Sequence, residues 1–178
     1  ISHKHKCIFV HINKTAGTSI SQKIPEGEEG SRKHLTAIEY REEFSESFEK
    51  YFKFTFVRNP WEKVLSQYFF RIKTRKGRRY TSFNEFIKHP VPSGCPLSVQ
   101  LDRISDNSGN ILVNFIGRFE NLQEDFNIIC EKIGIPEQQL PHKNKTKHKH
   151  YTEYYDDETR QIVAEKYAKD IEYFGYEF

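Results

Sequence analysis

Three runs of apolar residues, far apart along the chain, predict its strands. KCIFVHI at 6–12 and YFKFTFV at 51–57 are largely apolar, and NILVNFIGRF at 110–119 is a third run of this kind. Short apolar runs bounded by turn-forming residues are typical of strands that are buried within a sheet. The pattern therefore predicts three buried strands.

Helix signals follow the first of these runs. TSISQKI at 18–24 can open a helix directly after a short loop. Thr36 and Glu39 match a capping box, in which the threonine and the glutamate each bind a backbone N–H of the first turn. A helix is therefore expected to start next to Thr36 and to continue through IEYREEF.

Helices are also predicted after the second and third runs. Asn59 can cap a helix whose first turn holds Pro60 and which continues through WEKVLSQYFFRI. The segment 90–110 is rich in Pro, Ser, Gly and Asn and predicts a loop with one possible helical turn around 97–104. Apolar residues recur at helical spacing after it. They are Leu122, Phe126, Ile129 and Ile133, before the stop signals Gly134 and Pro136, and Ile162, Val163, Tyr167 and Ile171 in a last helix over 158–173.

The alternation of strands and helices predicts an α/β fold with a central, mainly parallel sheet. With 178 residues, of which 36% are hydrophobic and 15% aromatic, the chain is long and apolar enough to bury a core. We expect one domain over residues 1–178, since no internal repeat is present.

The cysteines favour a reducing compartment, and the hydropathy pattern does not predict a membrane-spanning helix. Cys7, Cys95 and Cys130 are odd in number and far apart, which predicts neither a disulfide framework nor a zinc site. No apolar run approaches the roughly twenty residues that a spanning helix needs. The expected location is the cytoplasm, although a leader or anchor removed from the natural ends remains an alternative.

The net charge of the chain is only +3, but its cations are concentrated in two basic runs. Residues 71–79, RIKTRKGRR, hold six cations, and residues 142–150, HKNKTKHKH, hold four lysines and three histidines. Each run alone also fits a solvated surface loop, but two in one small domain favour an anionic ligand. A metal site in the second run is disfavoured, because lysines surround its histidines and no carboxylate or thiol lies among them.

The loop after the first predicted strand has the composition of a phosphate site. Small residues let backbone N–H groups approach an anion, hydroxyls add donors, and the following helix contributes its positive end. Lys14 supplies a full charge, but it stands before the glycine, unlike the lysine of a Walker A loop. The segment therefore argues against ATP or GTP bound in the usual way. The candidate residues are Lys14, Thr15, Ala16, Gly17, Thr18 and Ser19.

A second phosphate site is predicted after the second strand. On the helix that begins at Pro60, Ser66 shares the polar face with Glu62 and Lys63, and it can line up behind Arg58. A guanidinium and a hydroxyl would then bind one phosphate. A strand-end ion pair for Arg58 and an idle surface role for Ser66 are the structural alternatives. The apolar face is expected to hold Trp61, Val64, Leu65, Tyr68, Phe69 and Ile72.

Two phosphate sites after two strands suit a nucleoside with phosphates at its 5′ and 3′ positions. FVHINKTAGTS at 9–19 and FTFVRNPWEKVLSQY at 54–68 resemble the segments that bind 3′-phosphoadenosine 5′-phosphosulfate (PAPS) in sulfotransferases. The chain is most similar to the carbohydrate group, which includes heparan sulfate 2-O- and 6-O-sulfotransferases and short bacterial relatives. The resemblance extends to IGRFENLQEDF at 116–126 and to the segment 154–178, and leaves about 75–108 unmatched.

The resemblance implies a P-loop-like three-layer fold and sulfuryl transfer from PAPS to a hydroxyl or, less readily, an amine, without a metal. It implies that residues 14–19 hold the 5′ phosphosulfate, and that Arg58 and Ser66 hold the 3′ phosphate of PAPS and of the product adenosine 3′,5′-bisphosphate. A cofactor-covering loop near the carboxyl end would hold Asn144, Lys145 and Thr146. The implied acceptor is a glycan or glycolipid, possibly anionic, and no nucleic-acid partner is expected.

Lys14 and His34 are the predicted catalytic residues. Lys14 would neutralise charge on the departing phosphate, and the acceptor hydroxyl needs a base with a pKa near neutrality. His34 is the first choice, because related enzymes use a His or Glu soon after the first loop and it stands just before a capped helix. A surface role is the alternative for His34, Glu39 and Glu42 are rival bases, and His11 is expected to be structural or to act behind the site.

Two other functions remain open from the residues. A nucleoside or small-molecule kinase would need a Walker A loop and a carboxylate for Mg²⁺, which the sequence does not display. A non-catalytic domain could bind an anionic polysaccharide through its basic runs alone.

Overall fold

The computed structural model describes residues 1–24, 34–74, 80–89, 98–141 and 149–178. Contacts divide the chain into two compact units. Unit 1 consists of Ile1–Val57 and Gln100–Lys143, and unit 2 consists of Arg58–Val99 and Asn144–Phe178. Each unit is described by itself.

A parallel three-stranded sheet forms the centre of unit 1. Its strands are β1 (Cys7–Phe9), β2 (Phe52–Val57) and β3 (Phe115–Arg118), in the order β1-β2-β3. Phe9 of β1 pairs with Phe54 of β2, and both pairings of the sheet are parallel. The three predicted strands are therefore confirmed, but β3 is shorter than the predicted run because Ile111 forms an isolated bridge with Ser105 before it begins.

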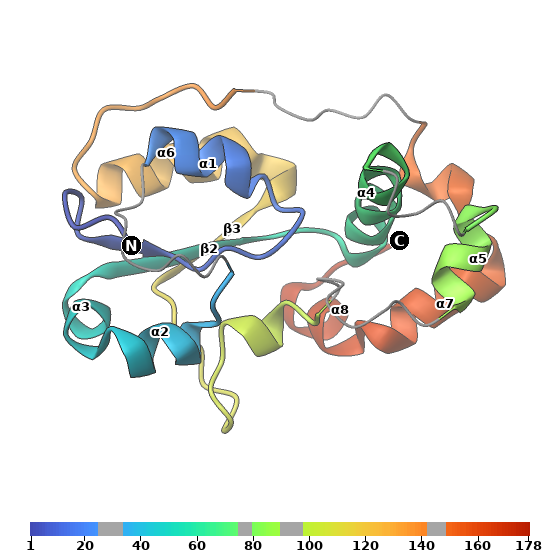
Figure 1. Ribbon diagram of the computed structural model, residues 1–178, viewed down its shortest axis with the longest axis horizontal. Helices are drawn as coiled ribbons and strands as arrows, with labels where there is room; N and C mark the ends of the chain where they lie inside the picture. Colours follow the sequence, from blue (N-terminus) through green and yellow to red (C-terminus); the bar gives the residue numbers. More distant parts are fainter. Residues whose placement is uncertain (25–33, 75–79, 90–97, 142–148) are drawn as a thin grey trace. The chain divides into compact units, whose positions relative to one another are not determined.

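Helices cover both faces of this sheet (Figure 1). The helices α1 (Gly17–Lys23) and α6 (Leu122–Lys132) lie on one face, and α2 (Ala37–Glu43) and α3 (Ser45–Lys50) lie on the other. Alternate residues of β1 and β2 point to the α1 and α6 side, where they form an apolar cluster. Its fully or almost fully buried members include Cys7, Phe9, Ile20, Phe54, Phe56, Phe126, Ile129 and Cys130. The predicted three-layer α/β class is confirmed.

Local signals set the ends of these helices. Thr36 and Glu39 form the complete predicted capping box at the start of α2. Gly134 follows α6 in the left-handed conformation (φ 69°), which lets the N–H of Ile135 bond back to the carbonyl of Cys130 at 2.9 Å. Two 3₁₀ helices, η1 (Leu101–Arg103) and η2 (Phe119–Asn121), complete unit 1, and η1 corresponds to the helical turn expected there.

Unit 2 is helical in its described part. It contains α4 (Pro60–Lys73), α5 (Phe83–Lys88), the 3₁₀ helix η3 (Tyr151–Tyr154), α7 (Asp157–Lys166) and α8 (Ala168–Phe174). The side chain of Asn59 caps α4 as predicted. The single last helix was predicted wrongly, because Tyr167 leaves helical geometry (ψ 24°) and separates α7 from α8. No helix among the described residues is long and apolar enough to span a membrane.

Aromatic side chains form the core of unit 2. Tyr167 is fully buried, and Trp61 and Phe86 are almost fully buried between α4, α5 and α7. The helix α4 deviates from its predicted faces at two positions. Lys63, expected on the polar face, is fully buried, whereas Ile72, expected on the apolar face, is 41% exposed. The last turn of α4 therefore adds less to this core than the periodicity indicated.

Truncation of Phe126 should test the core of unit 1. This residue of α6 is fully buried in the apolar cluster between α1, α6 and the sheet, so Phe126→Ala removes its transfer free energy and leaves a cavity. We expect the free energy of unfolding to fall by about 3–5 kcal/mol, measured by urea denaturation. The matched control is Ile128→Ala on the same helix, whose side chain is 38% exposed and should cost less than about 1 kcal/mol. Similar losses for both variants would contradict the packing described.

Candidate functional site

The loop between β1 and α1 has a strained backbone. Lys14 (φ 70°) and Ala16 (φ 65°) both adopt the left-handed conformation, and neither is a glycine. Such residues cost on the order of 1–3 kcal/mol each and persist only where the surrounding structure holds them. Ala16 also precedes the first turn of α1, with no side-chain cap. The segment that the sequence assigns to a phosphate thus stores strain of the kind found at ligand sites.

The three hydroxyls of this loop differ in their surroundings. Thr15 is fully buried, and its hydroxyl donates to the carbonyl of Ile12 at 2.7 Å. Ser19 is also buried and donates to the carbonyl of Pro141 at 2.8 Å. Thr18 is exposed. In this structure the first two hydroxyls bond within unit 1, and Thr18 is the one of the three whose side chain faces solvent.

His11 packs directly against the backbone of Gly17. A Cβ atom added at Gly17 would lie 1.8 Å from Nε2 of His11, far inside contact distance. On its other side the imidazole stacks on the ring of Phe9, with ring centroids 5.2 Å apart. Position 17 therefore has no room for a side chain while the His11 ring keeps this place, and its backbone is not left-handed.

The structure brings His34 to the same loop. Its ring centroid lies 4.3 Å from that of His11, and its Nδ1 is 3.3 Å from the carbonyl oxygen of His11. His34 adopts a left-handed backbone conformation (φ 73°), and Nη2 of Arg103 donates a hydrogen bond to its carbonyl oxygen. The predicted base is thus next to the predicted phosphate loop, with His11 between them.

Arg103 and Glu39 contribute charge near His34. Burial lowers the pKa of the Arg103 guanidinium, against the opposing influence of Glu39 and Tyr40. One carboxylate oxygen of Glu39 accepts hydrogen bonds from the N–H and the hydroxyl of Thr36, at 2.6 and 2.8 Å. Glu39, one of the two rival bases, is therefore engaged in the start of α2.

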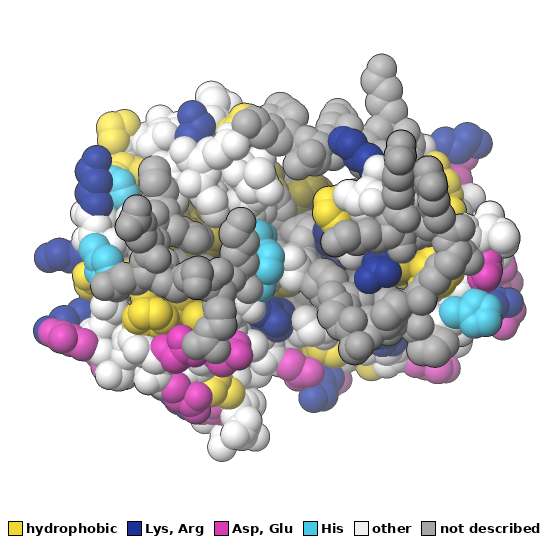
Figure 2. Space-filling view, viewed as in Figure 1, with side chains coloured by type: hydrophobic (Ala, Val, Ile, Leu, Met, Phe, Trp, Pro, Cys, Tyr) yellow, Lys and Arg dark blue, Asp and Glu magenta, His cyan; other side chains and the backbone are white. Residues whose placement is uncertain are grey.

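The other rival, Glu42, belongs to an acidic surface. Figure 2 shows acidic side chains gathered in the region that α2 and α3 occupy in Figure 1. Glu42, Glu43, Glu46 and Glu49 are all exposed there. Neighbouring negative charges make this surface unfavourable for a polyanionic acceptor.

In unit 2, Arg58 and Ser66 lie along the first turns of α4. Arg58 directly follows β2, and its guanidinium forms an ion pair with the carboxylate of Glu62 at 3.0 Å. The side chain of Arg58 is 8% exposed and that of Glu62 is 25% exposed. Ser66, half-buried, is one turn beyond Glu62 on the same face of the helix. The two residues predicted to bind the 3′ phosphate, Arg58 and Ser66, therefore have the carboxylate of Glu62 as a neighbour.

Lys63 does not belong to this group. Its ammonium donates to the carbonyl of Ser98 at 2.9 Å and lies 5.3 Å from the ring centroid of Tyr167. Its placement on the polar face was wrong, because the long methylene chain lets a lysine extend through an apolar interface to reach a carbonyl. Helical spacing alone does not reveal this.

Part of the predicted site lies outside the described residues. This applies to Asn144, Lys145 and Thr146, and to most of the two basic runs. Among the residues that the structure describes, no group of three or more His, Cys, Asp or Glu side chains could hold a metal ion.

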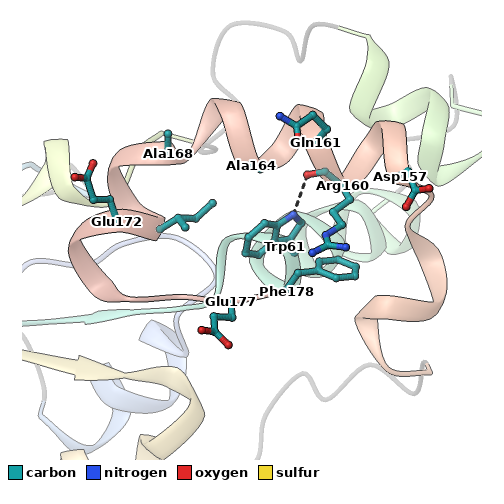
Figure 3. A pocket seen from close by; sticks show the side chains of 10 residues that line it. Trp61, Asp157, Arg160, Gln161, Ala164, Ala168, Glu172, Glu177 and Phe178 are labelled. Carbon is teal, nitrogen blue, oxygen red and sulfur yellow. Dashed lines mark hydrogen bonds between the residues drawn. The ribbon is translucent and has the colours of Figure 1, made fainter.

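Unit 2 also contains an open hollow of about 810 Å³ (Figure 3). Trp61, Ala164 and Phe178 contribute apolar surface to it, and the indole N–H of Trp61 donates to the carbonyl of Arg160 at 3.1 Å. Neither Arg58 nor Ser66 lines it. This hollow is therefore lined by other residues than those predicted to bind the 3′ phosphate.

Two residues near His34 could hardly be identified from the sequence alone. Arg103 lies in a segment for which only a helical turn was predicted, and its contact with His34 joins positions 69 residues apart. His11 was expected to be structural or to act behind the site because it stands where the strand meets the loop, but its contact with Gly17 depends on side-chain packing across the loop.

Comparisons with known proteins connect this chain to one family. A model of the sulfotransferase family matches residues 1–177. Human carbohydrate sulfotransferase 9 is 26% identical over 152 residues, which cover 68% of this chain and 33% of the human protein. An uncharacterized protein of Archaeoglobus fulgidus is 37% identical over 93 residues, 51% of this chain and 74% of the archaeal protein. No solved structure matches significantly. The chain thus corresponds to a third of the human relative's length.

Proposed function

Because this chain belongs to the sulfotransferase family and so to the enzymes that transfer sulfuryl groups, we propose that it uses PAPS to sulfate a hydroxyl of a glycan. The observation that carries the proposal is the contact series Gly17–His11–His34, which puts a candidate base beside a candidate phosphate loop. The parallel sheet with helices on both faces agrees with the P-loop-like fold of the family.

Residues 14–19 would hold the 5′ phosphosulfate of PAPS, which supplies the activated sulfuryl group. The strained backbone at Lys14 and Ala16 fits a loop that turns its N–H groups towards an anion, and the missing Cβ of Gly17 keeps the turn narrow. Lys14, half-buried in this loop, would neutralise charge on the departing phosphate. One well-placed donor of this kind is worth roughly 3–4 kcal/mol in a transition state.

Arg58 and Ser66 would hold the 3′ phosphate. A guanidinium that is 8% exposed is already largely ordered and desolvated, so it gives up little freedom when it binds an anion. Its ion pair with Glu62 orients it, and Glu62 would have to share the guanidinium with the phosphate. Asn144, Lys145 and Thr146 are proposed to cover the nucleotide.

His34 would accept the proton of the acceptor hydroxyl while the acceptor oxygen bonds to sulfur and the bond from sulfur to the phosphate oxygen breaks. The products are the sulfated acceptor and adenosine 3′,5′-bisphosphate. Transfer of this kind depends on alignment of the acceptor, the sulfur and the leaving oxygen, for which a rigidly held base is an advantage.

A glycan acceptor is supported by the name of the human relative and by the two basic runs in the sequence. An anionic glycan would suit these runs best, whereas the acidic surface of α2 and α3 would repel it. Transfer from labelled PAPS to a panel of desulfated heparin, desulfated chondroitin, a galactosylceramide and simple sugars would identify the acceptor class.

Nucleotide preference should separate this proposal from a kinase or a simple polysaccharide binder. Adenosine 3′,5′-bisphosphate should raise the melting temperature, because a ligand that binds the native state stabilises it by mass action. At one hundred times its Kd the gain is about 2.7 kcal/mol, measured by differential scanning fluorimetry. ATP with Mg²⁺ is the matched control and should have a clearly smaller effect. A response to ATP–Mg²⁺ alone would favour a kinase, and retention on heparin without any nucleotide response would favour the binder.

The 3′-phosphate residues can be tested with two ligands that differ in that phosphate. Arg58→Ala combined with Ser66→Ala should weaken adenosine 3′,5′-bisphosphate binding by roughly 10- to 100-fold, since a charge-assisted hydrogen bond is lost. Adenosine 5′-phosphosulfate, which lacks the 3′ phosphate, should bind nearly as before. Isothermal titration calorimetry measures both affinities, and equal losses would count against the assignment.

His34 should affect chemistry and not nucleotide binding. His34→Ala should lower kcat by roughly 10²- to 10⁴-fold, the usual contribution of a general base, with nearly unchanged affinity for adenosine 3′,5′-bisphosphate. A base acts in its unprotonated form, so the wild-type rate should rise with pH through one inflection that disappears in the variant. His89→Ala removes an exposed histidine and serves as the control. Near-full turnover of His34→Ala would move the base to Glu39, Glu42 or the unmatched middle segment.

A further inference from the structure

His34 lies outside the helices and strands, so no regular element orients its side chain. It immediately precedes the capping segment of α2, and its backbone is left-handed (φ 73°). Few side chains tolerate this conformation unless neighbouring contacts hold it. The orientation of the His34 ring must therefore come from residues outside its own segment.

One of these contacts is at the backbone. Nη2 of Arg103 donates to the carbonyl oxygen of His34 from η1, an element 69 residues further along the chain. Arg103 is half-buried, and among the described residues its Nε has no hydrogen-bond partner. The guanidinium is therefore held by the bond from Nη2 to His34 and by the nearby charge of Glu39. A hydrogen bond from a charged donor to a carbonyl is stronger than one from a neutral donor. Arg103 is therefore well suited to hold the strained backbone of His34 in place.

The second contact is at the ring. The imidazole of His11 lies between Gly17 of the loop and the ring of His34. The centroids of the two histidine rings are 4.3 Å apart, and the ring planes are inclined by 52°. Its stacking on Phe9, which is 4% exposed, anchors the imidazole to the sheet. A displacement of the loop at Gly17 would push on His11 and hence on His34.

We propose that His11 and Arg103 are positioning residues that hold His34 in a fixed relation to the phosphate loop. Neither His11 nor Arg103 binds the nucleotide or transfers a proton in this proposal, and both act through His34. The inference rests on the proposed function, because it takes His34 as the base. It accounts for the close packing of the His11 ring on Gly17, whose backbone is not left-handed.

The decisive experiment compares each variant in two backgrounds. In the wild-type background, His11→Ala and Arg103→Ala should each lower kcat by roughly 10- to 100-fold, the effect expected of an ångström-scale misplacement. The KM for PAPS and the affinity for adenosine 3′,5′-bisphosphate should be nearly unchanged. In a His34→Ala background the same changes should lower kcat no further, because the residue on which they act is gone. Lys50→Ala, which removes an exposed cation from α3, is the control.

Gly17 allows a test that needs no acceptor. Gly17→Ala places a methyl group in the space of the His11 ring and should weaken adenosine 3′,5′-bisphosphate binding. His11→Ala combined with Gly17→Ala empties that space, so binding should return to within about threefold of the wild type, a strongly non-additive result. If the double variant binds as weakly as Gly17→Ala, the glycine serves the ligand directly and the proposed link through His11 is wrong.

The outcomes separate this inference from the proposed function. If His34→Ala retains turnover, the assignment of the base fails. If His34→Ala loses turnover but His11→Ala and Arg103→Ala do not, or if they slow the His34→Ala enzyme further, the base stands and the positioning role is wrong. Should His11→Ala not fold, His11→Asn creates a smaller cavity and is judged by the same comparison.

Discussion

The parallel pairing of β1 with β2 is the constraint on which the rest of unit 1 depends. Phe9 is in register with Phe54, so β1 and β2 end at the same edge of the sheet, where β1 continues into the loop with Lys14. In parallel sheets this edge, at the carboxyl ends of the strands, is where ligand-binding loops gather. The apolar cluster with α1 and α6 makes the pairing rigid, because Phe54, Phe56 and Phe126 are fully buried in it.

The strain in the site depends on that rigid support. Lys14, Ala16 and His34 are left-handed without being glycines, and each needs neighbours that prevent it from relaxing. The supports differ in kind, since Thr15 and Ser19 bind backbone carbonyls of unit 1 while Arg103 binds the carbonyl of His34. A group-transfer enzyme that must align its reactants depends on such support for its geometry.

Much of the architecture was predictable because local signals and global structure agree. The capping box of α2 and the Asn59 cap of α4 were predicted residue by residue and are present. The errors fall where packing overrides periodicity: Lys63 is buried through its methylene chain, and the last helix is divided at Tyr167, a fully buried residue of the core. The roles of Lys14, His34, Arg58 and Ser66 remain predictions.

The sequence by itself determined the α/β class, the family resemblance and the candidate phosphate loop, because strand and helix periodicities and the motif at 9–19 are local along the chain. Only the tertiary structure decided which residues surround the candidate base. His11 lies between Gly17 and His34 through ring packing, and Arg103 reaches His34 from 69 residues away. Contacts of this kind depend on how distant segments meet around the sheet, and no spacing within a segment encodes them.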